Sequence, residues 1–195
     1  MAQLNRIEQF KSEASRAGAK VQEYGSLPEI ASFIIGLARQ HTANKVVISS
    51  PMLAGLIGLG EQLANEGIKV VDVDLSQPQT QQKLREACIE ADFGISEATV
   101  AIAETGTIVI ASDDGISRLA AVLPHLHITL VNCQNIVADL DEAVIRIKSM
   151  AHSTSSTLPT YVTFITGRNT TADIPGALLA RAQGPAEEHI LLIHL

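Results

Sequence analysis

Short apolar runs that alternate with helical segments constrain the fold of this chain more than any other feature of its sequence. "KVVISS" at 45–50 and "IKVVDVD" at 68–74 are rich in β-branched residues, and each is followed by a segment with a helical pattern. Continuous apolar strands separated by helices are typical of parallel sheets that are covered on both faces. The sequence therefore predicts an α/β fold with a mostly parallel sheet and helices on both of its faces.

The rest of the chain continues this alternation. The pattern predicts a helix over 27–40, with Pro28 in its first turn, and a helix over 139–151, with Asp139 or Asp141 near its N-cap. We expect further helices at 4–18, 52–67, 80–91 and 115–123, and further strands at 19–24, 127–132, 161–167 and 188–195. Residues 171–182 are expected to form a helical or irregular connection.

The alternation changes within "AIAETGTIVI" at 101–110. The strand-like runs on either side of Thr105–Gly106 are too close for a helical crossover, so a hairpin or a sharply kinked strand is required. Gly106 would supply a positive φ at the turn. Glu104, Thr105 and Thr107 would bring a carboxylate and two hydroxyls to a strand end, where ligands of open α/β sheets collect. Glu104 is therefore a candidate base, hydroxyl acceptor or nucleophile; the alternative is a hairpin turn whose glutamate is solvated or paired with an arginine.

A second segment, "SDDGISRL" at 112–119, follows directly. Ser112, Asp113 or Asp114 can cap a short helix there. Arg118 would lie about one turn into that helix, where its guanidinium could bind a carboxylate or phosphate in a bidentate manner. A salt bridge from Arg118 to Asp114 or Glu104 is the structural alternative.

The third segment is "ITGRNTTADI" at 165–174. Gly167 is expected to end a strand, and the N–H groups that follow could hold an anion. An ordinary turn with a capping threonine explains the same residues. The hypothesis that joins the three segments is that their side chains meet at one rim of the sheet and form an anion-binding hollow there.

Composition restricts the classes of function. At 195 residues the chain fits a single domain over 1–195, and its net charge of -7 argues against a nucleic-acid surface. No apolar run reaches the roughly 18 residues of a membrane span, and the first residues lack the layout of a signal peptide, so a cytoplasmic location is expected. Cys88 and Cys133 are expected to be reduced, buried thiols, although a disulfide between them is open. His125 and His127 favour a buried or interface role over zinc, and no metal site is predicted.

With these segments in view, the chain resembles the LUD-domain family, the lactate-utilization proteins of the LutC/LldG type. The resemblance is carried by "ADFGISEATVAIAETGTIVIAS" at 91–112, "SRLAAVLPHLHITLV" at 117–131 and "ITGRNTTADI" at 165–174, and more weakly by "QGPAEEHILLI" at 183–193. Residues 1–90 match only in general layout. The resemblance implies a Rossmann-like sheet of the NagB/RpiA/CoA-transferase group with a small β-hairpin addition.

The resemblance also implies a cytoplasmic role, with two iron–sulfur partners, in the oxidation of L-lactate to pyruvate. The clusters would belong to the partner subunits, and no intrinsic cofactor is expected in this chain. By position, the residues that the family marks fall on Glu104, Thr105, Gly106, Thr107, Arg118, Pro124, His127, Thr166, Gly167, Thr171 and Asp173. The chain departs from the family pattern at two places: Arg168–Asn169 replaces a common Pro-Ser, and Gln183 stands where a histidine is common.

The leading hypothesis is an accessory subunit that binds a small anionic ligand at a strand-end pocket. Arg118 would bind a small carboxylate and Glu104, the candidate catalytic residue, would orient it with its threonine neighbours. One alternative is a stand-alone enzyme acting on a CoA thioester or a sugar phosphate, with Glu104 as nucleophile. Another is a non-catalytic binding module. The first helix, which can lie on the domain or reach toward a partner, and the apolar "HILLIHL" at 189–195 leave room for a homodimer.

Overall fold

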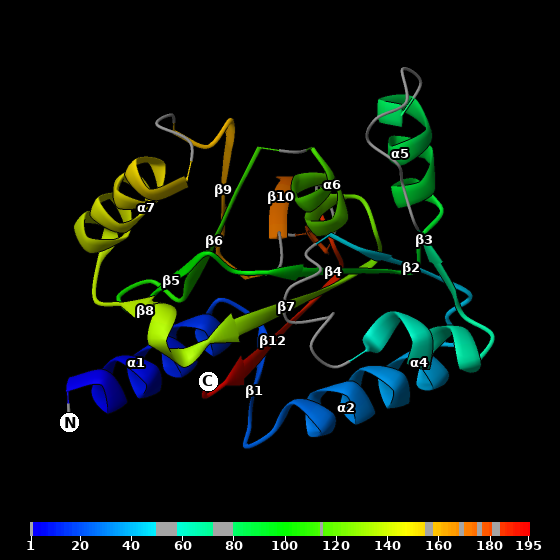
Figure 1. Cartoon of the computed structure of the whole chain (residues 1–195), viewed down its shortest axis with the longest axis horizontal. Helices are drawn as coiled ribbons and strands as arrows, with labels where there is room; N and C mark the ends of the chain where they lie inside the picture. Colours follow the sequence, from blue (N-terminus) through cyan, green and yellow to red (C-terminus); the bar gives the residue numbers. More distant parts are fainter. Residues whose placement is uncertain are drawn as a thin grey trace.

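A computed structural model gives the fold (Figure 1) and describes residues 2–49, 58–71, 80–113, 115–154, 158–167, 170–174, 177–180 and 184–195. Its largest sheet has six strands, and every neighbouring pair in it is parallel. The order across this sheet is β1 (Lys20–Tyr24), β12 (Glu187–Ile193), β7 (Leu126–Asn132), β4 (Phe93–Glu97), β2 (Lys45–Ile48) and β3 (Lys69–Val71). The mostly parallel α/β fold is therefore confirmed.

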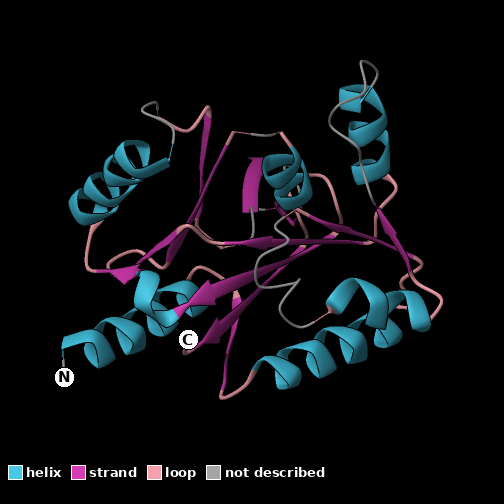
Figure 2. Cartoon of the chain, viewed as in Figure 1, coloured by secondary structure: helices cyan, strands magenta, loops and turns pink. Residues whose placement is uncertain are grey.

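Helices cover both faces of the parallel sheet, and Figure 2 shows them outside its strands. On one face, α2 (Leu27–Gln40) and α4 (Leu59–Asn65) enclose a core that includes Ile34, Leu63 and Ile128. On the other face lie α1 (Ala2–Arg16), α5 (Thr80–Ile89) and α6 (Ile116–Val122), whose buried residues pack on the alternate side chains of the same strands. The prediction of a sheet covered twice is confirmed, and Pro28 opens α2 as expected.

A second sheet accounts for the break in the alternation. It has four strands in the order β8 (Ile136–Val137), β5 (Val100–Ile102), β6 (Thr107–Ser112) and β9 (Tyr161–Ile165). Strands β5 and β6 pair in antiparallel register, so the hairpin is confirmed and the kinked strand is not formed. Helix α7 (Leu140–Thr154) packs on this sheet through Ala143 and Ile147, and Asp139 caps it by accepting a hydrogen bond from the Glu142 N–H at 2.9 Å. The addition is therefore larger than the predicted hairpin.

The segment after Gly167 differs from its prediction. Strands β10 (Thr170–Ile174) and β11 (Ala177–Ala180) form an antiparallel pair where a helical or irregular connection was expected. A helix over 171–182 would contain Pro175, which lacks an N–H and clashes with the preceding turn. The helical alternative was therefore wrong for a reason that is visible in the sequence.

Strand β4 was not predicted, although it lies at the centre of the parallel sheet. Its sequence, "FGISE", contains a glycine and two polar residues, which conceals the strand pattern. A Cβ at position 94 would lie 1.8 Å from the carbonyl oxygen of Ala120 in α6, so Gly94 lets that helix rest directly on the strand. The close packing of helix on sheet thus removed the side chain that would have marked the strand.

Helix α1 is anchored to the rest of the molecule by one apolar stripe. Ile7, Phe10 and Ala14 are buried and join the core that includes Ala101 and Ile190, so the helix links the parallel sheet to the second sheet. Among the described residues, no helix combines the length and apolar character that a membrane crossing requires.

Candidate functional site

Three threonine hydroxyls form a chain at the tip of the β5–β6 hairpin, which we name the hydroxyl rim. The Oγ1 atom of Thr107 lies 2.7 Å from that of Thr105 and 2.8 Å from that of Thr166, which directly follows β9. Thr107 is buried, whereas Thr105 and Thr166 are exposed. The structure therefore brings two of the three predicted segments together, through hydrogen bonds between residues 59 positions apart.

Two glycines of the same segments hold the hydroxyl rim against the end of α1. Gly106 has φ of 65°, and a Cβ there would lie 2.2 Å from the backbone nitrogen of Ala14. Gly167 has φ of 62°, and a Cβ there would lie 2.2 Å from the carbonyl oxygen of Ala17. The predicted positive φ of Gly106 is confirmed, and both positions exclude any other residue by conformation and by space. Packing thus accounts for the glycines of both motifs.

The electrostatic setting of the hydroxyl rim does not favour an anion. The rim touches the C-terminal end of α1, where the helix dipole places a partial negative charge. Glu104 is exposed beside it, and no described residue hydrogen-bonds to its carboxylate. Its backbone N–H donates to the carbonyl of Ala138 at 3.0 Å, which fixes the turn but leaves the side chain in solvent. Glu104 is therefore the residue of the motif that local packing does not explain.

Arg118 lies at the opposite end of β6 from the hydroxyl rim. Its guanidinium carbon is 5.5 Å from the centroid of the Tyr161 ring, and Tyr161 pairs with Ser112 at the end of the strand. Strand β6 has six residues, so its two ends, Thr107 and Ser112, lie about 17 Å apart. Glu104 precedes the first end, and Arg118 follows the other. The predicted salt bridge between them is not formed, and the two residues do not line a common hollow.

The other predicted site residues are placed only in part. Thr171 and Asp173 lie in β10, where Thr171 pairs with Leu179 across the hairpin. Asp114, Arg168–Asn169 and Gln183 lie outside the described residues. Asp113 does not cap α6 but accepts hydrogen bonds from the N–H and hydroxyl of Thr160, at 3.0 and 3.3 Å.

A second polar cluster lies inside the parallel sheet, and we name it the buried relay. Its members are Ser96 of β4, His127 and Thr129 of β7, and Glu188 of β12. His127 pairs across the sheet with Glu188, and Thr129 pairs with Ser96, so the four side chains occupy adjacent positions on one face. All four are at most 2% exposed.

The hydrogen bonds of the buried relay form one continuous sequence. His127 Nε2 lies 2.7 Å from the Ser96 hydroxyl, and His127 Nδ1 lies 2.8 Å from Glu188 Oε2. The Thr129 hydroxyl donates to Glu188 Oε1 at 2.9 Å. In one consistent assignment, Ser96 donates to Nε2 while Nδ1–H and Thr129 donate to the carboxylate. The relay can therefore hold or pass a proton between three strands, but its side chains are closed to solvent.

One member of the buried relay was singled out from the sequence. Pro124 and the strand that follows it predicted a buried or interface role for His125 and His127; the structure buries His127, whereas His125 is exposed. Glu188 was not singled out, nor were Ser96 and Thr129. A polar residue in the middle of an otherwise apolar strand was the available signal, because such a residue needs a buried partner.

Both cysteines are free and buried, as predicted. Burial raises the pKa of the Cys88 thiol and that of the Cys133 thiol to about 11 each, because the thiolate would lose its hydration. At neutral pH the two side chains thus behave as small apolar residues. Neither thiol lies in the hydroxyl rim or in the buried relay.

Comparison with known proteins agrees with this architecture. The LUD domain matches residues 7–193. "Lactate utilization protein B" of Bacillus velezensis is 24% identical over 96% of this chain and 48% of its own length. "Lactate utilization protein C" of Shouchella clausii is 26% identical over 70% of this chain and 56% of its own length. The chain thus spans about half the length of these relatives.

A solved structure supports the same conclusion at the level of fold. The DUF162 family protein of Deinococcus radiodurans superimposes with a TM-score of 0.61 over 99% of both chains, at 18% identity. The family match covers both the parallel sheet and the second sheet, and so includes the hydroxyl rim and the buried relay. The chain therefore belongs to the LUD-domain family.

Proposed function

We propose that this chain is an accessory protein of an iron–sulfur system that oxidises L-lactate to pyruvate. The observation that carries the proposal is the LUD-domain match over residues 7–193, together with two kinds of relative that are named for lactate utilization. Those names describe the relatives, which are about twice as long as the region they share with this chain. A role in lactate utilization is the function that they have in common.

The cysteine content supports placing the electron carriers on partner proteins. Oxidation of lactate to pyruvate releases two electrons and two protons, which an acceptor must take. A cluster usually requires four thiolates, whereas these 195 residues contain two cysteines, both buried and on separate elements. Clusters held by this chain alone are therefore not part of the proposal, and the accessory role consists of binding and positioning.

Arg118 supports the binding of a small carboxylate or phosphate. Its guanidinium is exposed and stacks on Tyr161, and no described residue takes a hydrogen bond from it. A planar guanidinium held on a ring keeps its N–H edge available for a bidentate carboxylate. The ligand is accordingly proposed at the α6–β9 end of the second sheet. Glu104 lies at the other end, so its predicted part in orienting the ligand rests on the sequence motif alone.

The experiment that tests the function is genetic. Deletion of the gene in its own organism should abolish growth on L-lactate while growth on glucose continues, and the intact chain should restore it. Arg118→Ala should restore growth poorly, whereas the matched variant Arg16→Ala, which alters an exposed pair with Glu13, should restore it fully. Undiminished growth of the deletion strain on L-lactate would reject the proposal.

Thermal-shift titration of the purified chain separates the alternatives. L-lactate, pyruvate, CoA and sugar phosphates form the panel, because a ligand that binds the native state raises the midpoint even when it binds weakly. Turnover of a CoA thioester or sugar phosphate without partners, lost in Glu104→Gln, would indicate the stand-alone enzyme. Binding that has no effect on lactate oxidation would indicate a non-catalytic module.

A further inference from the structure

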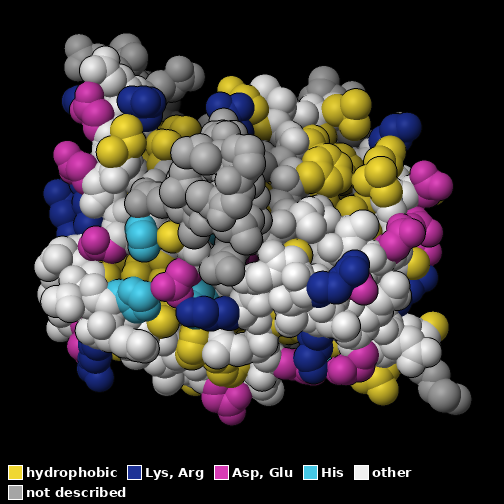
Figure 3. Space-filling view, turned by 180° about the vertical axis from the view of Figure 1, so that it is seen from behind, with side chains coloured by type: hydrophobic (Ala, Val, Ile, Leu, Met, Phe, Trp, Pro, Cys, Tyr) yellow, Lys and Arg dark blue, Asp and Glu magenta, His cyan; other side chains and the backbone are white. Residues whose placement is uncertain are grey.

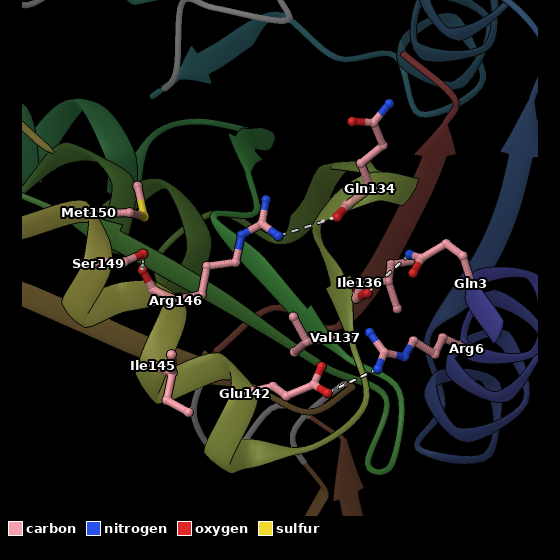
Figure 4. A pocket seen from close by; sticks show the side chains of 10 residues that line it. All are labelled: Gln3, Arg6, Gln134, Ile136, Val137, Glu142, Ile145, Arg146, Ser149 and Met150. Atoms are coloured by element: carbon pink, nitrogen blue, oxygen red, sulfur yellow. Dashed lines mark hydrogen bonds and ion pairs between the residues drawn. The ribbon is translucent and has the colours of Figure 1, made fainter.

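A groove runs between α1 and α7, with β8 as its floor (Figure 4). It has a volume of about 730 Å³ and lies apart from the hydroxyl rim and the buried relay. Arg6 borders it on α1, Ile145 and Arg146 border it on α7, and Ile136 and Val137 form its floor. Nothing in the sequence motifs pointed to this surface.

The charges of the groove are fixed by hydrogen bonds. Arg6 donates to Glu142 Oε1 at 2.9 Å, and Glu142 Oε2 accepts from the Ala138 N–H at 3.0 Å, so the charges of Arg6 and Glu142 cancel. In Figure 4 Arg146 reaches across the groove to the carbonyl of Gln134, to which it donates at 3.5 Å. It also donates to Asn135 Oδ1 at 2.6 Å. Among the described residues Arg146 has no carboxylate partner. The groove therefore carries one uncompensated positive charge in a chain of net charge -7.

Exposed apolar side chains also lie on the two helices that form the groove. Of the ten large apolar residues that are exposed in the described part of the chain, Ile145 and Met150 line the groove, and Leu4 and Leu140 lie elsewhere on α1 and α7. Ile145 is the most exposed of the ten, at 67%. Figure 3, seen from behind, shows apolar side chains gathering on the side of the molecule that carries α7 and β9. An apolar patch beside a fixed charge is typical of a protein contact.

The chemistry of the groove selects one kind of occupant. A small-molecule site encloses most of its ligand, whereas a wall residue that is two-thirds exposed cannot enclose one. A second copy of the chain would bring a further net charge of -7, which opposes association. Strand addition at β8 is also blocked, because Gln3 Nε2 already donates to the carbonyls of Cys133 and Ile136, at 2.6 and 3.1 Å. A segment of another protein remains, and it must complement Arg146.

We propose that the α1–α7 groove binds a segment of an iron–sulfur partner protein that presents a carboxylate beside an apolar side chain. The carboxylate pairs with Arg146, and the apolar side chain packs on Ile145 and Met150. An amphipathic helix meets this requirement, since it places such residues three or four positions apart on one face. This inference rests on the proposed function, because that function supplies the partner.

The test uses the full-length chain with an affinity tag, produced in its own organism during growth on L-lactate. Co-purifying protein is identified by mass spectrometry and quantified by its iron and acid-labile sulfide. We expect Ile145→Asp and Arg146→Glu each to reduce the recovered iron–sulfur protein at least tenfold. Ile89→Asp and Arg85→Glu, which make the same changes at exposed positions of α5, should recover as much as the wild type.

The outcomes separate the groove from the proposed function. If the wild-type chain recovers no iron–sulfur protein, the proposed function fails. If the groove variants recover as much as the wild type, the groove inference is wrong while the function stands. If light scattering finds a wild-type dimer that Ile145→Asp dissociates, the groove is a self-interface and the inference is also wrong. Both substituted residues are exposed, so unchanged circular dichroism and thermal midpoints are expected to confirm that the variants fold.

Discussion

The buried relay and the hydroxyl rim are both chains of hydrogen-bonded side chains, but they lie in opposite environments. The relay is enclosed within the parallel sheet, and its four members are at most 2% exposed. The rim lies at the tip of a hairpin, where Thr105 and Thr166 face solvent and Thr107 alone is buried. A hydrogen bond contributes little net free energy at an exposed position, whereas a buried polar group that loses its partner is costly. The hydrogen bonds of the relay should therefore contribute more to stability than those of the rim, and the rim should be held mainly by the packing of its backbone.

Removal of the relay carboxylate should have the largest effect. Glu188→Ala leaves His127 and Thr129 without an acceptor inside the protein, so we expect the free energy of unfolding to fall by about 3–5 kcal/mol. Urea unfolding measures this change. Glu187→Ala, at the neighbouring position, removes a partly exposed pair with Lys20 and should cost less than about 1 kcal/mol. If the two variants lost the same free energy of unfolding, the buried relay would not be the source of the stability at position 188.

The next effect tests the backbone of the hydroxyl rim. Gly106→Ala combines a positive φ with a clash against Ala14, so we expect the free energy of unfolding to fall by about 2–4 kcal/mol. Gly67→Ala is the matched variant, because Gly67 has φ of 78° but a Cβ added there would meet no described atom within 4 Å. Its free energy of unfolding should fall only by the cost of the positive φ for alanine, about 1–2 kcal/mol. If both variants unfold at the same urea concentration, close packing against α1 does not hold the rim.

The hydroxyl chain itself should matter less than its backbone. Thr107→Val preserves shape and removes the hydroxyl that links Thr105 and Thr166, so a loss of about 1–2 kcal/mol is expected. Thr163→Val in β9, where no described hydrogen bond is lost, should be close to neutral. Chemical denaturation of the two variants measures the difference. If Thr107→Val lowered the free energy of unfolding as much as Glu188→Ala, the rim and the relay would contribute equally to stability, which would contradict the comparison.

The smallest effect concerns a histidine that lacks the complete pairing of the relay. His189 lies on the opposite face of β12, and none of the described residues hydrogen-bonds to its Nδ1. Burial lowers the pKa of His189 below the usual 6.5, and its contact with Glu187 offsets this in part. The positive charges of Lys20 and His41 also lower this pKa. Below about pH 6.5 the unfolded chain thus binds more protons than the folded one at this position, so stability falls as the pH decreases. His189→Phe should weaken this dependence between pH 7 and 5, as followed by thermal unfolding; an unchanged slope would contradict it.

The separation of Glu104 from Arg118 shows why sequence motifs alone did not predict a joint site. The turn at Gly106 and the start of the helix that carries Arg118 were placed correctly, because glycine and hydroxyl residues have local preferences that the sequence displays. Whether two turns face each other depends on the direction of the strand between them. Here β6 carries the two residues to its opposite ends, and its antiparallel pairing with β9 brings Thr166, rather than Arg118, to Thr107. The single anion-binding hollow was therefore wrong as a joint site.

The sequence by itself determined the α/β class, the parallel sheet with its two helical layers and a sharp change of direction at Glu104–Thr107, and it limited His127 to a buried or interface role. These features follow from hydrophobic periodicity and local turn chemistry, which act between residues close in the chain. Tertiary structure decided the central position of β4, the second sheet, the buried relay and the α1–α7 groove. Each of these depends on contacts between distant segments, such as Ser96 with His127 or Arg6 with Glu142, whose geometry is fixed only when the strands and helices pack.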